Sequence, residues 1–123
     1  MTRWTQAGGP YQFPFMGAGS RTLAGEHEIA CPRCAEAALR GYFHAFKPET
    51  GRGTLWVWCP RCRTTTHLPR VTPKVEVGPD PFADLSLEQF DALERSEPLL
   101  DRLDRLWEQG ALWFASTRGA RRR

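Results

Sequence analysis

The sequence predicts an α+β fold, in which a three-stranded antiparallel sheet is followed by two helices. Three observations support this prediction. All four cysteines occur in two identical Cys-Pro-Arg-Cys turns, residues 31–34 and 59–62. Short runs rich in β-branched and aromatic residues lie between and after these turns, and two amphipathic segments with helix-start signals lie near the carboxyl end. The length of 123 residues suits one domain or a small metal module with an appendage.

The spacing of the cysteines predicts a metal site. Cys31 and Cys34 are separated from Cys59 and Cys62 by 24 residues, which is enough for a hairpin that brings the two pairs together. Two cysteines in such a turn direct both sulfurs to one side, which suits tetrahedral Zn²⁺. Because four thiolates fill every coordination position, we expect one structural zinc ion with no place for water or substrate.

Other uses of the cysteines are less compatible with the sequence. Disulfides would require export, but residues 1–20 contain one Arg and no apolar run typical of a signal peptide. A thioredoxin-type site uses a single CxxC motif. An iron–sulfur cluster would accept four thiolates, although paired Cys-Pro-x-Cys turns more often hold zinc. His67 could replace one thiol as a ligand. No run of about 18 apolar residues occurs, so we expect a soluble protein with no membrane partner. Free thiols held by metal, without an export signal, predict a cytoplasmic protein.

The segments around the cysteines follow the order of a zinc ribbon. Residues 39–46 and 54–58 are β-prone and flank a turn rich in Gly and Pro, so they predict a hairpin. Residues 64–68 predict a third strand. The chain therefore contains a cysteine turn (a zinc knuckle), a hairpin, a second knuckle and a strand, in that order. This order predicts a zinc ribbon over residues 27–72.

The rest of the chain divides by composition. Residues 1–26 are rich in Gly and Pro, with scattered aromatic residues and no regular period, so we expect an irregular N-terminal arm. Residues 73–85 contain three prolines and predict a linker or a wrapping loop. Residues 86–115 form an acidic helical segment, and residues 116–123 a basic tail.

Two helices are expected in the acidic segment. Ser86 and Gln89 match a capping box at the start of the first helix, Pro98 suits the first turn of the second, and Gly110 suits its end. Each helix has one apolar face, which must be buried. We expect both helices to pack on the aromatic side of the ribbon, formed by Tyr42, Phe43, Phe46, Trp56 and Trp58.

Charge is distributed unevenly within the net value of +3. Residues 27–75 carry eight Lys or Arg against three Glu, or +5, whereas residues 76–108 carry ten Asp or Glu against three Arg, or −7. The acidic helices are either a solubilising face or a surface that docks onto a basic protein. The candidate partner-binding residues are Glu88, Asp91, Glu94, Asp101, Asp104 and Glu108.

Two other functions were weighed against protein binding. Arg40, Arg52, Arg61 and Arg63, interleaved with aromatic residues, could bind nucleic acid in transcription or RNA handling. Alternatively, the helices cover these aromatic residues and the acidic residues pair with these arginines. No set of a nucleophile and a general base stands out, so we expect neither an enzyme nor a small-molecule substrate. A zinc-dependent nuclease or hydrolase would need a coordination position on the metal that no protein ligand fills.

Residues 31–68 resemble small bacterial zinc-ribbon proteins with an RG-[ST]-LW-x-WC-x-x-C…H core, here Arg52 to Cys59, Cys62 and His67. Those proteins are often encoded near secreted polymorphic toxins and look like immunity proteins. The resemblance implies zinc on the four cysteines and a role as an immunity protein that binds and neutralises a cognate toxin. The resemblance does not identify the toxin, but the acidic helices suit a basic one such as a nuclease. Together with the lack of catalytic groups, this predicts a non-catalytic role.

Overall fold

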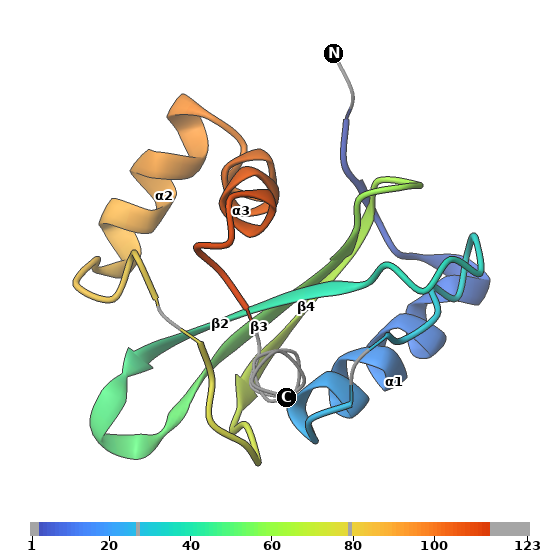
Figure 1. The fold of residues 1–123 in the computed structure, drawn as a ribbon. Helices are drawn as coiled ribbons and strands as arrows, with labels where there is room; N and C mark the ends of the chain where they lie inside the picture. Colours follow the sequence, from blue (N-terminus) through green and yellow to red (C-terminus); the bar gives the residue numbers. More distant parts are fainter. Residues whose placement is uncertain (1–2, 27, 79, 114–123) are drawn as a thin grey trace.

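A computed structural model describes residues 3–26, 28–78 and 80–113 of the chain. A four-stranded mixed sheet in the order β1-β4-β3-β2 lies between helix α1 on one face and helices α2 and α3 on the other (Figure 1). The α+β class is therefore confirmed. The strands are β1 Thr5–Gln6, β2 Arg40–Lys47, β3 Arg52–Cys59 and β4 Thr64–Val71, and the helices are α1 Gln12–Leu23, α2 Leu87–Ser96 and α3 Leu99–Glu108.

The sheet has four strands instead of the predicted three. Strands β2, β3 and β4 pair antiparallel, with Tyr42 opposite Trp56 and Trp56 opposite His67. The added strand β1 lies parallel to β4 at the sheet edge, where the Ala7 amide donates to the Thr65 carbonyl over 2.7 Å. Alternation of apolar and polar residues cannot reveal a strand of two residues, because its pattern is too short.

The expectation of an irregular arm over residues 1–26 is wrong. Helix α1 occupies 12 of these residues although it contains Pro14, Gly17 and Gly19, which are poor helix formers. It is held by packing: Phe15 is fully buried, and a Cβ on Gly19 would lie only 2.7 Å from a methyl carbon of Leu68 on β4. Tertiary contacts therefore override weak helix propensity in this segment.

Alternating side chains give the sheet two apolar faces, and each face has its own core. On β3, Leu55 and Val57 face α1 and pack with Leu23, whereas Trp56 and Trp58 face α2 and α3. Of the five aromatic residues that we expected beneath the C-terminal helices, four lie there. The fifth, Phe43, packs on the α1 side. A sheet covered on both faces buries far more apolar surface than an isolated ribbon could.

The C-terminal helices begin and end close to the predicted signals, although Pro98 is the N-cap of α3 and not its first helical residue. Ser86 accepts a hydrogen bond from the Gln89 amide, and the Gln89 side chain accepts one from the Ser86 amide, so the capping box is confirmed. Gly110 follows the end of α3 with a left-handed φ of 79°. The two helices bury Phe90, Leu99 and Leu103 against the aromatic face of the sheet, where the Phe90 ring stacks on Trp56 at 5.7 Å.

The segment predicted as a linker, residues 73–85, packs on both faces of the sheet within its described part. Val75 and Val77 contact the core on the α1 side, and Phe82 contacts the core on the α2 side. Between them, Asp80 accepts hydrogen bonds from the Tyr42 hydroxyl and from the Phe82 amide, and its carboxylate lies 2.8 Å from Nδ1 of His44. One carboxylate therefore anchors this loop to β2.

Replacing Asp80 with alanine is expected to lower the free energy of unfolding by about 2 kcal/mol, because the buried polar groups of Tyr42 and His44 lose a partner. Urea denaturation followed by tryptophan fluorescence measures this change. Asp84→Ala is the matched control, since Asp84 is an exposed carboxylate in the same segment, and it should change stability by less than about 0.5 kcal/mol. Equal stability of the two variants would contradict the anchoring role of Asp80.

Candidate metal centre

Each cysteine pair lies in a tight turn of the same construction. The Ala35 amide donates to the Cys31 carbonyl over 2.8 Å, and the Arg63 amide donates to the Cys59 carbonyl over 2.9 Å. Ala35 and Arg63, the residues directly after each second cysteine, both adopt a left-handed φ, at 68° and 58°. This conformation is uncommon for residues other than glycine, so its presence in both turns indicates two equivalent knuckles.

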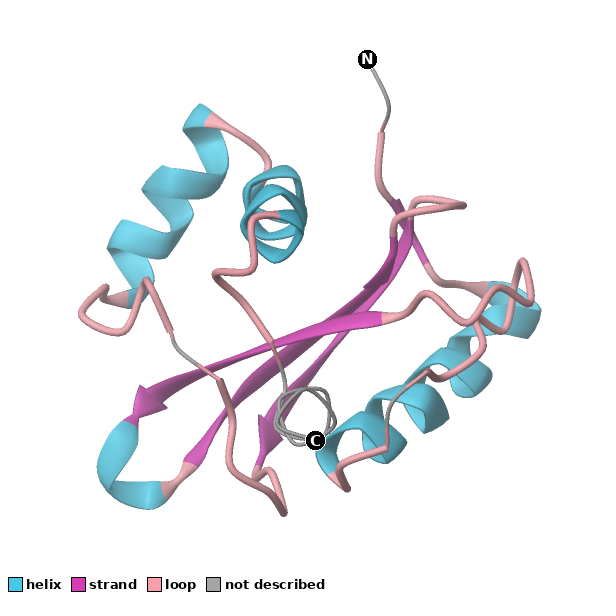
Figure 2. Cartoon of the chain, viewed as in Figure 1, coloured by secondary structure: helices cyan, strands magenta, loops and turns pink. Residues whose placement is uncertain are grey.

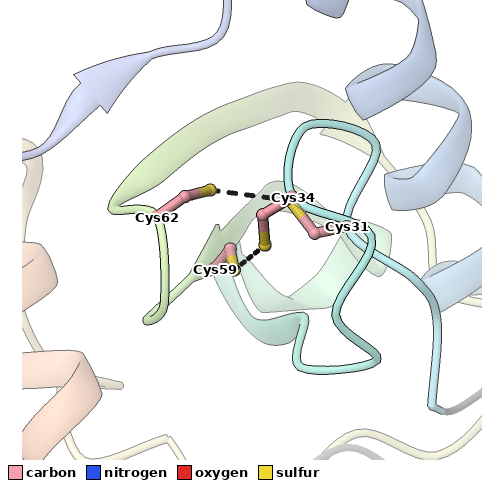
Figure 3. A group of neighbouring side chains, drawn as sticks. All are labelled: Cys31, Cys34, Cys59 and Cys62. Carbon is pink, nitrogen blue, oxygen red and sulfur yellow. Dashed lines mark hydrogen bonds between the residues drawn. The ribbon is translucent and has the colours of Figure 1, made fainter.

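The knuckles bring the four sulfurs into one cluster (Figure 3). The Sγ atoms of Cys31 and Cys62 lie 3.6 Å apart, those of Cys34 and Cys59 lie 3.7 Å apart, and all four sulfurs lie within 4.8 Å of one another. A tetrahedral ion with metal–sulfur bonds of about 2.3 Å requires sulfurs about 3.8 Å apart. The separations fit such an ion and far exceed the roughly 2.05 Å of a disulfide bond.

The N-terminal segment, which the sequence did not link to the site, covers the sulfurs. Cys31 and Cys59 are buried in a cluster with Ala7 and Phe15, while the other two cysteines are half-buried. Thr64, also missed, places its hydroxyl 3.3 Å from the Cys62 sulfur. The centre therefore consists of two knuckles closed on one side by the β1–α1 region.

Burial controls the ionisation of these thiols in the absence of a cation. Desolvation raises the pKa of Cys31, and it raises the pKa of Cys59 to about 12. For Cys62, desolvation also raises the pKa, but hydrogen bonds with Thr64 and with the neighbouring thiols outweigh it, so the pKa is lowered overall. A metal ion would have to displace protons from the buried thiols and would supply the positive charge that stabilises four thiolates.

His67 does not belong to the sulfur cluster. The group of possible ligands found among the described residues contains the four cysteines alone. His67 is exposed on β4, in register with Trp56. His27 lies outside the described residues.

The fold and this cluster define an α+β protein with a candidate four-cysteine metal centre. No protein-family model, curated protein or solved structure matches the chain. The resemblance to immunity-type zinc ribbons therefore stays a prediction. Among the described residues, no helix is long and apolar enough to cross a membrane.

Two of the six predicted partner-binding carboxylates contact strands of the chain's own sheet. Asp104 on α3 accepts hydrogen bonds from Arg40 on β2 over 2.7 Å and from the Trp58 indole on β3 over 2.8 Å. Glu108 forms a second ion pair with Arg40. The positive charge of the sheet and the negative charge of α3 therefore neutralise each other in part within one molecule.

Asp101 and Glu94 have structural contacts of the same kind. Asp101 accepts a hydrogen bond from the Trp4 indole over 2.7 Å and lies 3.5 Å from the Arg63 guanidinium. The Glu94 carboxylate accepts a hydrogen bond from the Leu99 amide at the start of α3. The remaining two carboxylates, on α2, are exposed and have no ion-pair partner among the described residues; they are Glu88 and Asp91.

The four arginines proposed for nucleic-acid binding do not form one free face. Arg40 and Arg63 pair with α3, and Arg61 lies 3.7 Å from the exposed carboxylate of Glu36. Arg52 lies at the other end of β3, away from the knuckles. The structure therefore places Arg52 apart from the other three arginines, and those three lie beside carboxylates.

An acid–base cluster of Tyr42, His44 and Asp80 lies beneath α2, where Tyr42 and His44 are buried and Asp80 is half-buried. The Tyr42 hydroxyl lies 3.2 Å from Nδ1 of His44, and burial together with Asp80 raises the Tyr42 pKa well above its usual range. His44 is fully buried between the rings of Phe46 and Phe90, at 4.4 and 4.5 Å. Because these rings cover the imidazole, we assign the cluster to packing and loop anchoring.

Proposed function

We propose that the protein binds one structural zinc ion through Cys31, Cys34, Cys59 and Cys62. The observation that carries this proposal is the compact cluster of four sulfurs, at separations suited to a tetrahedral ion. Zinc prefers such all-thiolate tetrahedral sites, and paired Cys-Pro-x-Cys turns favour it over an iron–sulfur cluster. When bound, the ion would join the two knuckles and stabilise the fold. It would leave no coordination position for water or substrate, so the proposed role is non-catalytic.

We infer that the protein acts by binding another protein, and that the outer face of α2 contributes to the contact. Leu87 is 61% exposed and neighbours the free carboxylates of Glu88 and Asp91. An exposed apolar side chain beside unpaired negative charge suits a basic partner surface, because charge attraction speeds association. A toxin domain such as a nuclease has this chemistry, which agrees with the immunity role implied by the resemblance.

Nucleic-acid binding through Arg40, Arg52, Arg61 and Arg63 is less well supported. Three of these four side chains have acidic neighbours in the structure, and releasing Arg40 or Arg63 for phosphate would break their ion pairs with α3. The aromatic residues expected to stack on bases are largely covered by α2 and α3. Both observations favour the protein-binding proposal.

The protein-binding proposal predicts that removing the two free charges of α2 weakens toxin binding. In Glu88→Gln/Asp91→Asn, we expect about tenfold lower affinity for the toxin encoded by a neighbouring gene, mainly through slower association. Surface plasmon resonance measures this change, and rescue of growth on co-expression gives the biological readout.

The matched control for this experiment is Glu28→Gln/Glu49→Gln, which removes the same charge from exposed carboxylates outside α2. It should bind within about twofold of the unaltered protein. If the α2 variant and the control bind equally, α2 is not the contact surface. If the unaltered protein neither binds nor protects against any neighbouring toxin, the immunity proposal itself is contradicted, whatever its metal content.

A further inference from the structure

A cleft of about 370 Å³ lies at the end of the sheet opposite the cysteines. Its position follows from the register of β2 and β3: Arg40 pairs with Trp58 near the knuckles, and Lys47 pairs with Arg52 at the other end. Figure 2 shows the short helical turn Pro48–Thr50 that joins the two strands there. The metal centre and the α3 contacts therefore play no part in forming this cleft.

Two irregularities in the strand pairing lie at this end of the sheet. The pairing of β2 with β3 shifts between His44 and Lys47, and the pairing of β3 with β4 shifts between Gly53 and Leu55. Such bulges leave residues unpaired and bend the strands. Arg70, which lines the cleft on β4, has a left-handed φ of 57°, uncommon for a residue other than glycine. Strained backbone of this kind is concentrated at functional sites.

Three positive side chains line the cleft, one from each of three neighbouring strands. They are Lys47 of β2, Arg52 of β3 and Arg70 of β4, and all three are exposed. None of them forms an ion pair with a carboxylate in the described part of the chain. Phe46 and Pro69 supply an apolar wall between the charges. The cleft therefore combines positive charge that is free to bind a ligand with an apolar surface.

We propose that this cleft binds a phosphate ester of the size of a mononucleotide. Guanidinium groups bind phosphate oxygens with two parallel hydrogen bonds, and the lysine ammonium adds a point charge. The apolar wall would contact the sugar or base. The volume lies within the range of about 300 to 1,000 Å³ that is typical of small-ligand sites. A free nucleotide and a nucleotide unit of single-stranded nucleic acid present the same phosphate, sugar and base to this cleft. The cleft is independent of the surface proposed to bind a toxin.

Isothermal titration calorimetry with AMP tests this proposal, with adenosine as the ligand that lacks phosphate. The variant Arg52→Gln/Arg70→Asn removes two charges from the cleft, and asparagine tolerates the left-handed conformation of residue 70. We expect AMP to bind with a dissociation constant near 1 mM or tighter, and this variant to bind at least about tenfold more weakly. Adenosine should not bind detectably.

The control variant is Arg3→Gln/Arg95→Gln, which removes two exposed charges elsewhere and should keep its AMP affinity within about twofold. Amide NMR shifts at Arg52, Gly53 and Arg70 place binding in the cleft. A short single-stranded oligonucleotide distinguishes the two sources of phosphate. If it binds more tightly than AMP, and the cleft variant loses this affinity to the same extent, the natural ligand is nucleic acid. If it binds more weakly than AMP, the natural ligand is a free nucleotide. Equal affinity of the cleft and control variants, or no binding of AMP below about 10 mM, would overturn the proposal.

Discussion

If the proposed zinc ion is bound, replacing Cys31 or Cys59 with serine is expected to release it and to unfold the chain. Both sulfurs are buried, so each variant loses a metal ligand and leaves a buried hydroxyl in its place. Structural zinc contributes about 10 to 16 kcal/mol of apparent binding free energy, which equals or exceeds the roughly 5 to 15 kcal/mol that stabilises a typical domain. Metal analysis should fall from one zinc per chain to well below that value, and the cooperative thermal transition should disappear.

The control for the cysteine variants is Ala35→Gly, which changes a knuckle without changing a ligand. Because Ala35 has a left-handed φ of 68°, glycine should be accommodated there without strain, and zinc content should stay at one per chain. Treatment of the unaltered protein with a strong chelator should reproduce the loss of the thermal transition. A serine variant that stays folded with full zinc content would contradict the assignment of that ligand.

Replacing Asp104 with alanine is expected to lower the free energy of unfolding by about 2 to 3 kcal/mol. This carboxylate accepts hydrogen bonds from the Arg40 guanidinium and from the indole of the fully buried Trp58, and its own side chain is 19% exposed. Removing this carboxylate leaves the Trp58 indole without its acceptor and leaves the largely buried Arg40 paired only with the exposed carboxylate of Glu108, which costs more than loss of an exposed pair. Urea denaturation measures the change.

Asp91→Ala is the matched control for Asp104, because it makes the same replacement in the neighbouring helix α2. Asp91 is exposed and has no ion-pair partner among the described residues, so its stability change should remain within about 0.5 kcal/mol. Both variants gain the same helix propensity, and the difference between them isolates the contact with the sheet. If the two variants lose equal stability, α3 is not held on the sheet by this carboxylate.

The elements that the sequence predicts well are those specified by local chemistry. The two Cys-Pro-Arg-Cys turns specify their own shape, and the sulfurs lie together as expected. The capping box of Ser86 and Gln89 and the stop at Gly110 define helix ends through hydrogen bonds and φ values within a few residues. Such signals do not depend on the rest of the fold.

The elements that the sequence does not reveal depend on distant contacts. Helix α1 contains Pro14, Gly17 and Gly19, and it is stabilised by the burial of Phe15 beside the cysteines and by close approach to Leu68. No local rule favours a helix with this composition. Strand β1 is likewise defined by its partner β4 and not by its own two residues.

The acidic segment shows how composition alone can mislead. Its net charge of −7 suggested an external partner, but Asp104 and Glu108 pair with the sheet of the same chain, and Asp101 pairs with Trp4 and Arg63 next to strands β1 and β4. These residues follow a helical spacing of three and four positions, so they form one stripe beside the apolar face of α3. Glu88 and Asp91 on α2 are also three positions apart, so spacing alone could not separate the carboxylates that pair within the chain from those that do not.

X-ray absorption spectroscopy of the zinc-loaded protein tests the central claim most directly. A saturated site made by Cys31, Cys34, Cys59 and Cys62 predicts four sulfur neighbours at about 2.3 Å and no nitrogen or oxygen ligand. A spectrum with three sulfurs and one oxygen or nitrogen would contradict the claim. It would show an incomplete thiolate set and would restore the case for metal-dependent hydrolysis.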